Sequence, residues 1–171
     1  MSNTNKIETE RKYIIEIPNV KILEAMSGFT SSEITQIYIT DPERTHRIRK
    51  RVYLGGGVEY TENTKKRISG MSSIENERAI TEDEFDVLKE RIEPNSRALA
   101  KRRVAFEFLN KVFEIDVYPE WQRLCILEVE LEREDEKIVF PSFINVICEV
   151  TGRREYSNHS MAYNFPDEPK M

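Results

Sequence analysis

Charged side chains recur at every second position in several segments of this 171-residue chain, and most of these pairs carry one sign of charge. The acidic pairs are Glu8 and Glu10, Glu75 and Glu77, Glu114 and Asp116, and Glu128 and Glu130; the basic pairs are Arg47 and Arg49, and Lys101 and Arg103. In a β-strand, residues i and i+2 lie about 6.6 Å apart and point the same way. Guanidinium and ammonium groups bind phosphate oxygens, whereas carboxylates without His or Cys suit Mg²⁺ or Mn²⁺. The pairs therefore predict a site for a metal-bound phosphate chain.

The direction in which the pairs point decides whether they form such a site. For a single pair, a solvent-exposed face is the ordinary interpretation. A solvated face gains nothing from sorting charges by sign, however, and Glu128 and Glu130 alternate with Leu127, Val129 and Leu131 in the most hydrophobic strand-like segment. If these apolar residues face outward beneath other elements, the two carboxylates face the concave side of a sheet. Because unpaired buried charge is costly, such an interior must hold water and neutralising ligands.

Strand-like segments dominate the chain, and they must position the charged pairs. Eight segments alternate with period two and contain β-branched or aromatic residues. They are Lys6–Ile17, Glu33–Thr40, Thr45–Leu54, Val58–Ile68, Ile74–Ile80, Ala100–Leu109, Lys111–Tyr118 and Leu124–Glu132. Gly55-Gly56-Gly57 predicts a hairpin connection and not a phosphate-binding loop, since no Lys-Ser/Thr follows it. The pattern favours an α+β, mainly β fold built as an antiparallel barrel or a strongly curved sheet.

Three segments have helical patterns. The first starts at the capping box Thr81–Glu84 and continues with apolar residues at helical spacing to Ile92. The second starts at Pro141 and carries an apolar stripe as far as Val150. Asn19–Gly28 forms a third, shorter candidate. We therefore expect a few helices flanking the strands.

Length and composition indicate one domain, residues 1–171, with a core of useful size. Charged residues make up 33% of the chain and hydrophobic residues 39%, which argues against disorder, and the net charge of −5 argues against general binding to nucleic-acid backbones. No segment approaches the roughly 18 apolar residues of a membrane span, and the polar N-terminus lacks a secretory core. Cys125 and Cys148 form no metal-binding or disulfide array, which predicts a reduced, cytoplasmic protein.

An ordered series of motifs along nearly the whole chain resembles the CYTH, or triphosphate tunnel metalloenzyme, superfamily. The first motif is the E-x-E-x-K signature Glu8-Thr9-Glu10-Arg11-Lys12. The others are Arg47-Ile48-Arg49, Thr64-Lys65-Lys66, Glu75-Asn76-Glu77, Lys101-Arg102-Arg103, Glu114-Ile115-Asp116, Glu128-Val129-Glu130 and Tyr156-Ser157-Asn158. This resemblance implies an eight-stranded antiparallel β-barrel, a tunnel whose lumen binds a triphosphate and a divalent metal, Mg²⁺ or Mn²⁺.

The resemblance also implies roles for single residues. The implied metal ligands are Glu8, Glu10, Asp116, Glu128 and Glu130, with Glu75 and Glu77 as a second acidic pair near a second metal. The implied phosphate-binding residues are Lys12, Arg47, Arg49, Lys66, Lys101, Arg103 and Arg154. Among all of these, Glu8, Glu10, Lys12 and Glu130 are the implied catalytic residues. Lys66 is preferred to Lys65 because the family's T-x-K motif places its lysine two residues after Thr64.

Two positions depart from the family pattern. Glu155 stands where a basic residue commonly precedes the tyrosine of the last motif, and Arg154 or Arg153 could supply that charge. Ser73 stands where an arginine is common, two residues before the second acidic pair. Either change could weaken the binding of the terminal phosphate or alter the preferred triphosphate, but neither removes the predicted metal site.

The resemblance implies a metal-dependent hydrolase of inorganic tripolyphosphate or a nucleoside triphosphate. Two alternatives stay open: an adenylate cyclase that makes cyclic AMP and pyrophosphate, and a non-catalytic module that only binds polyphosphate. A cyclase must hold adenosine inside the tunnel, and the sequence identifies no adenine pocket. We expect a triphosphate-containing small molecule as partner, neither a membrane nor a specific nucleic acid, and a homodimer as the assembly that related tunnels often form.

Overall fold

The computed structural model describes the backbone of residues 4–170 and the side chains of residues 7–170. Its strands are β1 (Thr4–Glu16), β2 (Thr30–Tyr38), β3 (Thr45–Tyr53), β4 (Val58–Arg67), β5 (Ser72–Ala79), β6 (Leu99–Phe108), β7 (Lys111–Val117), β8 (Leu124–Leu131) and β9 (Val146–Glu149). Its helices are α1 (Val20–Glu24), α2 (Glu82–Lys89), α3 (Asn158–Tyr163) and the short 3₁₀ helix η1 (Arg154–Tyr156). None of the helices in this part of the chain has the length and apolarity needed to span a bilayer.

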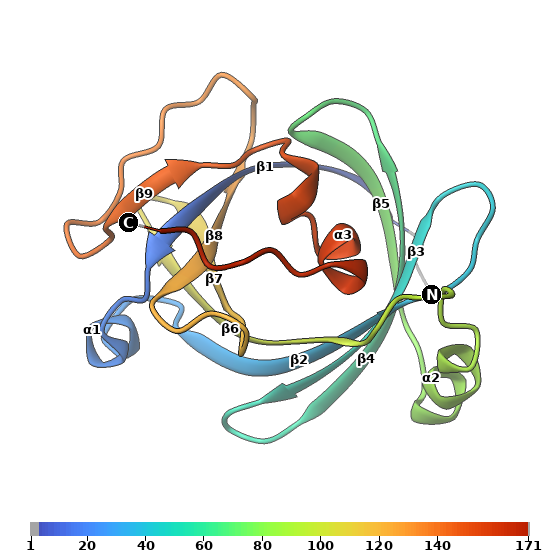
Figure 1. Ribbon diagram of the computed structural model, residues 1–171. Coiled ribbons are helices and arrows are strands. Elements are labelled where there is room, and N and C mark those ends of the chain that lie inside the picture. The colour runs from blue at the N-terminus through green and yellow to red at the C-terminus, as the bar shows by residue number, and fades with distance from the viewer. Residues whose placement is uncertain (1–3, 171) are drawn as a thin grey trace.

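Strands β1 to β8 close into an antiparallel barrel, and Figure 1 looks into the resulting ring. The hydrogen-bonded order is β5-β4-β3-β2-β6-β7-β8-β1, and pairing of β1 with β5 completes the circle. β1 is long enough to use two partners on one edge: residues 4–9 pair with β5, whereas residues 13–15 pair with β9. The expected eight-stranded antiparallel barrel with a few flanking helices is confirmed.

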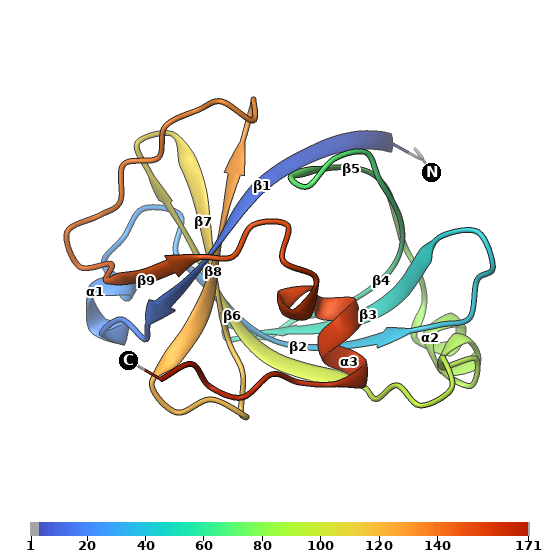
Figure 2. The same cartoon turned by 45° about the horizontal axis from the view of Figure 1, so that its top comes forward.

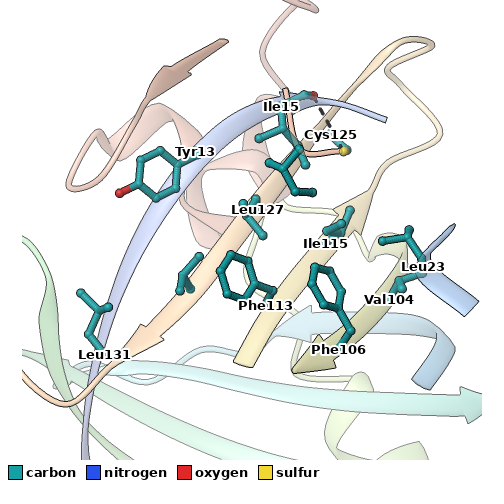
Figure 3. Packing of buried hydrophobic residues seen from close by; sticks show 12 residues of the cluster. Tyr13, Ile15, Leu23, Val104, Phe106, Phe113, Ile115, Cys125, Leu127 and Leu131 are labelled. Carbon is teal, nitrogen blue, oxygen red and sulfur yellow. Dashed lines mark hydrogen bonds between the residues drawn. The ribbon is translucent and has the colours of Figure 1, made fainter. Parts of the chain in front are cut away.

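The main hydrophobic core lies outside the barrel wall, on the outer faces of β1, β6, β7 and β8. Phe113, Leu127 and Val129 are fully buried there, and Figure 3 shows Phe113 and Leu127 among the apolar side chains of the neighbouring strands. Leu23 of α1 and the irregular segment 138–146 cover this face. Because side chains alternate along a strand, burying the odd-numbered residues of β8 outward turns its even-numbered residues toward the barrel interior.

One end of the barrel interior is filled by a second apolar cluster. Ile14, Leu124 and Ile126 pack there against Tyr156 and Met161 from the C-terminal region. The C-terminal segment is fastened across this end, since Trp121 donates a hydrogen bond from Nε1 to the Pro166 carbonyl at 3.0 Å. Figures 1 and 2 show η1, α3 and the chain beyond them lying across the ring. The polar part of the interior is therefore closed off on one side.

The helices agree only in part with the sequence patterns. α2 begins at the predicted capping box, in which Thr81 Oγ1 accepts from the Glu84 amide and the Glu84 carboxylate accepts from the Thr81 amide. α1 lies within the predicted range 19–28 but is limited to Val20–Glu24. The helix predicted from Pro141 to Val150 is wrong: this segment contains turns and then β9. Its residues hydrogen-bond along the edge of β1 that β5 has left, and this pairing outweighs the helical spacing.

Candidate functional site

A polar cavity of about 620 Å³ lies inside the barrel, within the size range of small-molecule sites. Among the side chains that the structure describes, seven carboxylates and seven basic groups line it. The carboxylates are those of Glu8, Glu10, Glu75, Glu77, Glu114, Glu128 and Glu130; the basic groups are those of Lys12, Arg47, Arg49, Lys65, Arg67, Arg103 and Arg154. Four of the six charged pairs thus reach one interior space with both members, and the other two pairs with one member each, Arg103 and Glu114.

Strand register decides which charges stand beside each other in the cavity. Glu10 is the cross-strand partner of Glu130, and Lys12 is the partner of Glu128, so β1 and β8 bring these four side chains to one wall. Cross-strand partners share a face of the sheet. On the other wall β4 sets Lys65 opposite Glu75 of β5. The fold therefore places an acidic wall on β1 and β8 across from a more basic wall on β3 and β4.

Two cations neutralise Glu128 in the acidic wall. Lys12 Nζ lies 2.8 Å from Glu128 Oε1, and Arg103 Nη2 lies 2.8 Å from Glu128 Oε2. Burial alone would raise the pKa of the Glu128 carboxyl, but Lys12 and Arg103 hold that pKa well below its usual value. Arg103 also contacts Glu114 at 2.5 Å and Asp116 at 2.6 Å. Arg103 thus pairs with three carboxylates, those of Glu114, Asp116 and Glu128.

Glu10 and Glu130 have no such direct partner among the described residues; Glu10 is half-buried and Glu130 is exposed at the cavity. Neither carboxylate makes a hydrogen bond or ion pair with another side chain between residues 7 and 170, although the two residues are cross-strand partners. The pKa of Glu10 is raised, first by burial and then by the nearby charge of Glu128. A carboxylate in that position favours any added positive charge, whether a proton or a metal ion.

The basic wall on β3 carries donors without protein acceptors. The Nε atoms of Arg47 and Arg49 are buried and make no hydrogen bond within the described structure. Burial and the charges of Arg47 and Arg103 lower the pKa of Arg49 to about 10, so the guanidinium is still charged at neutral pH. Arg47 reaches Glu75 only at 3.6 Å. Oxygen-rich anions would satisfy these donors, because a guanidinium fork matches phosphate geometry.

Glu75 partly neutralises the positive charge of the basic wall. Lys65 Nζ lies 2.7 Å from Glu75 Oε1, and Asn63 donates to Glu75 Oε2 at 3.0 Å. Burial opposes ionisation of Glu75, but Arg47 and Lys65 outweigh it and set its pKa to about 2. Ser73, the departure noted in the sequence, is buried beside it, with Oγ 3.4 Å from Glu75 Oε1.

Eleven of the residues predicted to form the site line this cavity. They are Glu8, Glu10, Lys12, Arg47, Arg49, Glu75, Glu77, Arg103, Glu128, Glu130 and Arg154. Arg154 lies at the cavity, whereas Glu155 pairs with Arg153 at 2.7 Å on the exposed surface. The glutamate that departs from the family pattern therefore adds no negative charge to the site, and Arg154 supplies the basic group there.

The preference for Lys66 over Lys65 is wrong. Lys66 is exposed and lines a separate hollow on the outer surface, together with Thr64 and Asn76. Lys65 faces the cavity, because its cross-strand partners Thr45 and Glu75 both line that cavity. The inward lysine is therefore the residue directly after Thr64.

Lys101 and Asp116 do not reach the cavity wall. Asp116 is fully buried and Lys101 is 3% exposed, and their charged groups meet at 2.6 Å. Burial would raise the pKa of Asp116, but Arg103 and Lys101 more than reverse this effect and lower it. The same burial lowers the pKa of Lys101 to about 8 in spite of the Asp116 charge. In this structure the two residues form a buried ion pair, in contrast to the direct metal and phosphate contacts that the resemblance implies.

Several cavity residues were given no individual role from the sequence. Glu114 belongs to a charged pair of the sequence analysis, but only its neighbour Asp116 was assigned a role; Arg67 could have been found, since it lies two residues from Lys65. Asn158 and His159 of α3 also line the cavity. They belong to no alternating run, so strand periodicity gives no signal for them, although Asn158 ends the sequence motif Tyr156-Ser157-Asn158.

The donor set suits a hard cation. Between residues 7 and 170, no three Asp, Glu, His or Cys side chains form a ready-made metal cluster. Mg²⁺ commonly binds through one or two carboxylates and completes its shell with water and substrate phosphates. The carboxylates of Glu10 and Glu130, side by side on paired strands and without ion-pair partners in the described structure, meet that requirement.

Comparison with known proteins identifies the fold. No protein-family profile matches the sequence, and no curated protein matches it. The crystal structure of the inorganic triphosphatase NE1496 is similar, with a TM-score of 0.57 and 25% identity over 96% of this chain and 99% of that chain. A second NE1496 structure, described as a hypothetical protein, gives 0.56 and 26% over 93% and 99%. PH1819 from Pyrococcus horikoshii OT3 gives 0.56 and 20% over 75% and 80%. The chain therefore has the CYTH, or triphosphate tunnel, fold that its motifs indicate.

Proposed function

We propose that the protein is a divalent-metal-dependent triphosphatase that cleaves a phosphoanhydride bond of inorganic tripolyphosphate or a nucleoside triphosphate. The observation that carries the proposal is the division of one cavity into two unsatisfied walls. Arg47 and Arg49 present unpaired Nε donors on one wall, and Glu10 and Glu130 present carboxylates without a direct ion-pair partner in the described structure on the other. The similarity to the inorganic triphosphatase NE1496 supports the same conclusion.

The basic wall binds the phosphate chain in this proposal. Arg47, Arg49 and Arg67 come from neighbouring strands β3 and β4, and Arg154 approaches from η1. Several guanidinium groups around one cavity can contact successive phosphates of a linear chain. They also stabilise the negative charge that grows on the departing diphosphate during cleavage.

The acidic wall holds the metal ion in this proposal. Glu10 and Glu130 are the main ligands, with Glu8 beside them. When bound, Mg²⁺ or Mn²⁺ would supply positive charge that screens the phosphate oxygens and acidifies water in the site. Lys12 and Arg103 keep Glu128 ionised and hold it in place next to these ligands.

Direct attack by water fits the side chains at the cavity better than a covalent intermediate. Among the described residues that line the cavity, His159 is the one histidine, and no cysteine lines it. The Nε2 atom of His159 lies 2.7 Å from Glu93 Oε2. It is therefore bound to a carboxylate and not paired with a hydroxyl or thiol nucleophile. The proposal accordingly assigns the chain the tasks of binding, orienting and neutralising the substrate.

A product assay tests the proposal. The protein is incubated with tripolyphosphate or ATP in Mg²⁺, in Mn²⁺ and in EDTA, and orthophosphate, pyrophosphate and cyclic AMP are measured. We expect orthophosphate only when metal is present, and at least a hundredfold lower rate in Glu130→Gln. Glu132→Gln, two positions later on a residue that does not line the cavity, is the matched control and should keep the wild-type rate.

Each other outcome assigns a different function. Cyclic AMP with pyrophosphate from ATP would identify a cyclase, and tight binding without any product would identify a polyphosphate-binding module. Equal loss of activity in Glu130→Gln and Glu132→Gln would contradict the assignment of Glu130 as a metal ligand.

A further inference from the structure

Asn158, at the start of α3, has a side-chain amide whose oxygen is hydrogen-bonded within the described structure and whose nitrogen is not. Its Oδ1 accepts a hydrogen bond from the Tyr118 hydroxyl at 2.7 Å and one from Lys101 Nζ at 3.3 Å. An ammonium group only donates, so the amide atom that faces Lys101 must be the oxygen. The Nδ2 branch of the amide therefore points away from this pair, and Asn158 lines the cavity.

The two groups that hold Asn158 are themselves immobilised. Lys101 is 3% exposed and pairs with the fully buried Asp116 at 2.6 Å. Tyr118 is 1% exposed and packs edge-on against Trp121. The centroid of its ring also lies 5.1 Å from that of the Phe165 ring. Burial, followed by the charges of Asp116 and Glu128, raises the pKa of Tyr118 well above its usual value, so its phenol stays a donor.

The other polar side chains at this end of α3 are occupied. Ser157 and Ser160 hydrogen-bond to each other through their hydroxyls at 2.9 Å, and Ser157 also caps the helix. His159 is bound to Glu93 at 2.7 Å. Asn158 Nδ2 has no hydrogen-bond acceptor among the described residues, so it can still donate into the cavity.

We propose that Asn158 is a substrate-binding residue whose Nδ2 donates a hydrogen bond to a phosphate oxygen of the bound triphosphate, and that Lys101 and Tyr118 are positioning residues that act through it. Hydrogen bonds to Oδ1 polarise the amide and make its N–H groups better donors. Lys101 therefore acts on the phosphate chain through Asn158 and does not contact it directly. The inference rests on the proposed function, since it requires a triphosphate in the cavity.

The direct test replaces the donor while keeping the shape. Asn158→Asp retains an oxygen toward Lys101 and Tyr118 and places a second, negatively charged oxygen where Nδ2 stood. Binding of inorganic tripolyphosphate is measured by calorimetry in EDTA, where no hydrolysis is expected, and the Michaelis constant is measured in Mg²⁺. We expect the dissociation constant to rise at least about tenfold. Asn164→Asp, the same change at the exposed C-cap of α3, should bind as the wild type does.

A double-mutant cycle separates positioning from general structural support. Tyr118→Phe removes only the hydroxyl and should weaken tripolyphosphate binding about threefold in the wild-type background. In an Asn158→Ala background the same change should have no further effect on the dissociation constant, because its route to the ligand is gone. Melting curves of all variants record any loss of folding separately from the coupling.

The possible failures are distinguishable. If Asn158→Asp and Asn158→Ala bind tripolyphosphate as tightly as the wild type, Asn158 does not contact the substrate and the inference is overturned. If Tyr118→Phe weakens binding equally in both backgrounds, the positioning role is overturned. If the wild-type protein neither binds tripolyphosphate in EDTA nor hydrolyses it in Mg²⁺, the proposed function itself fails, and the inference fails with it.

Discussion

Arg49 shows how the site trades stability for binding. Its guanidinium is buried near Arg47 and Arg103, its pKa is lowered to about 10, and its Nε has no partner in the described structure. Without a ligand this charge opposes folding, because it is desolvated and repelled by its neighbours. A bound phosphate chain would remove both penalties.

Arg49→Gln should therefore raise stability and reduce binding at the same time. Removing the charge should increase the free energy of unfolding by roughly 1 kcal/mol without ligand, or ~2–4 °C in melting temperature. The dissociation constant for tripolyphosphate should rise at least about tenfold. Lys50→Gln, on the next residue and the outer face, is the control. An unchanged or lower melting temperature for Arg49→Gln would show that its charge is not strained.

Lys65 and Lys66 provide the sharpest comparison of two adjacent side chains. Lys65 lies 2.7 Å from Glu75 in the cavity, whereas Lys66 lies outside the barrel. Lys65→Ala should raise the Michaelis constant for the triphosphate about tenfold or more, and Lys66→Ala should leave it unchanged. Steady-state kinetics of the two variants provide the measurement. The opposite ranking would mean that the strand has the other register.

The sequence identified the charged runs but could not orient every member of them. For Glu8, Glu10, Arg47 and Arg49, simple alternation was enough to predict the cavity wall. The choice between Lys65 and Lys66 depends on cross-strand pairing, which a single sequence does not contain. Asp116 shows a second limit: its burial follows from the packing around Arg103 and Lys101, not from its spacing.

Helix α2 is a structural element on the outside of the barrel, remote from the cavity. Its capping box satisfies the Glu84 and Thr81 amides, and Phe85 packs against Ile37, Ile48 and Ile80. Thr81→Ala should lower the free energy of unfolding by about 1 kcal/mol, measured by urea denaturation. The activity per folded molecule should not change. A marked fall in turnover at full folding would mean that α2 supports the cavity more directly than its contacts indicate.

The C-terminal third of the chain was the least predictable part. Residues 141–150 have helical spacing of apolar groups, but the free edge of β1 pairs with Val146–Glu149 instead. Such an edge exists because β5 leaves β1 after Thr9, a tertiary event with no local sequence signal. Helix α3 was missed because it is short and its buried residues, Met161 and Ala162, are too few to form a periodic pattern.

Considered together, the barrel walls make the protein sensitive to acid. Glu75 has a pKa of about 2 in the folded protein against an ordinary value of 4.5, so the unfolded chain binds its proton first as the pH falls. Its contribution to stability is complete above about pH 4.5 and disappears as the pH falls through about 2.

Glu75→Gln should therefore flatten the dependence of the unfolding free energy on pH between about 5 and 2. Urea denaturation at a series of pH values measures that slope, with Glu132→Gln as the control. The same slope in Glu75→Gln and wild type would show that the ion pairs of Glu75 with Lys65 and Arg47 do not stabilise the fold.

The homodimer, the cytoplasmic location and the lack of a nucleic-acid partner stay predictions.

A crystal structure with tripolyphosphate and Mn²⁺ tests the two-wall cavity most directly, because anomalous scattering locates the metal independently of the phosphates. The account predicts phosphate oxygens within hydrogen-bond distance of Arg47, Arg49 and Lys65, and a manganese peak beside Glu10 and Glu130. It is contradicted if the cavity stays free of both while tripolyphosphate or manganese binds on the outer surface, for example in the hollow beside Lys66.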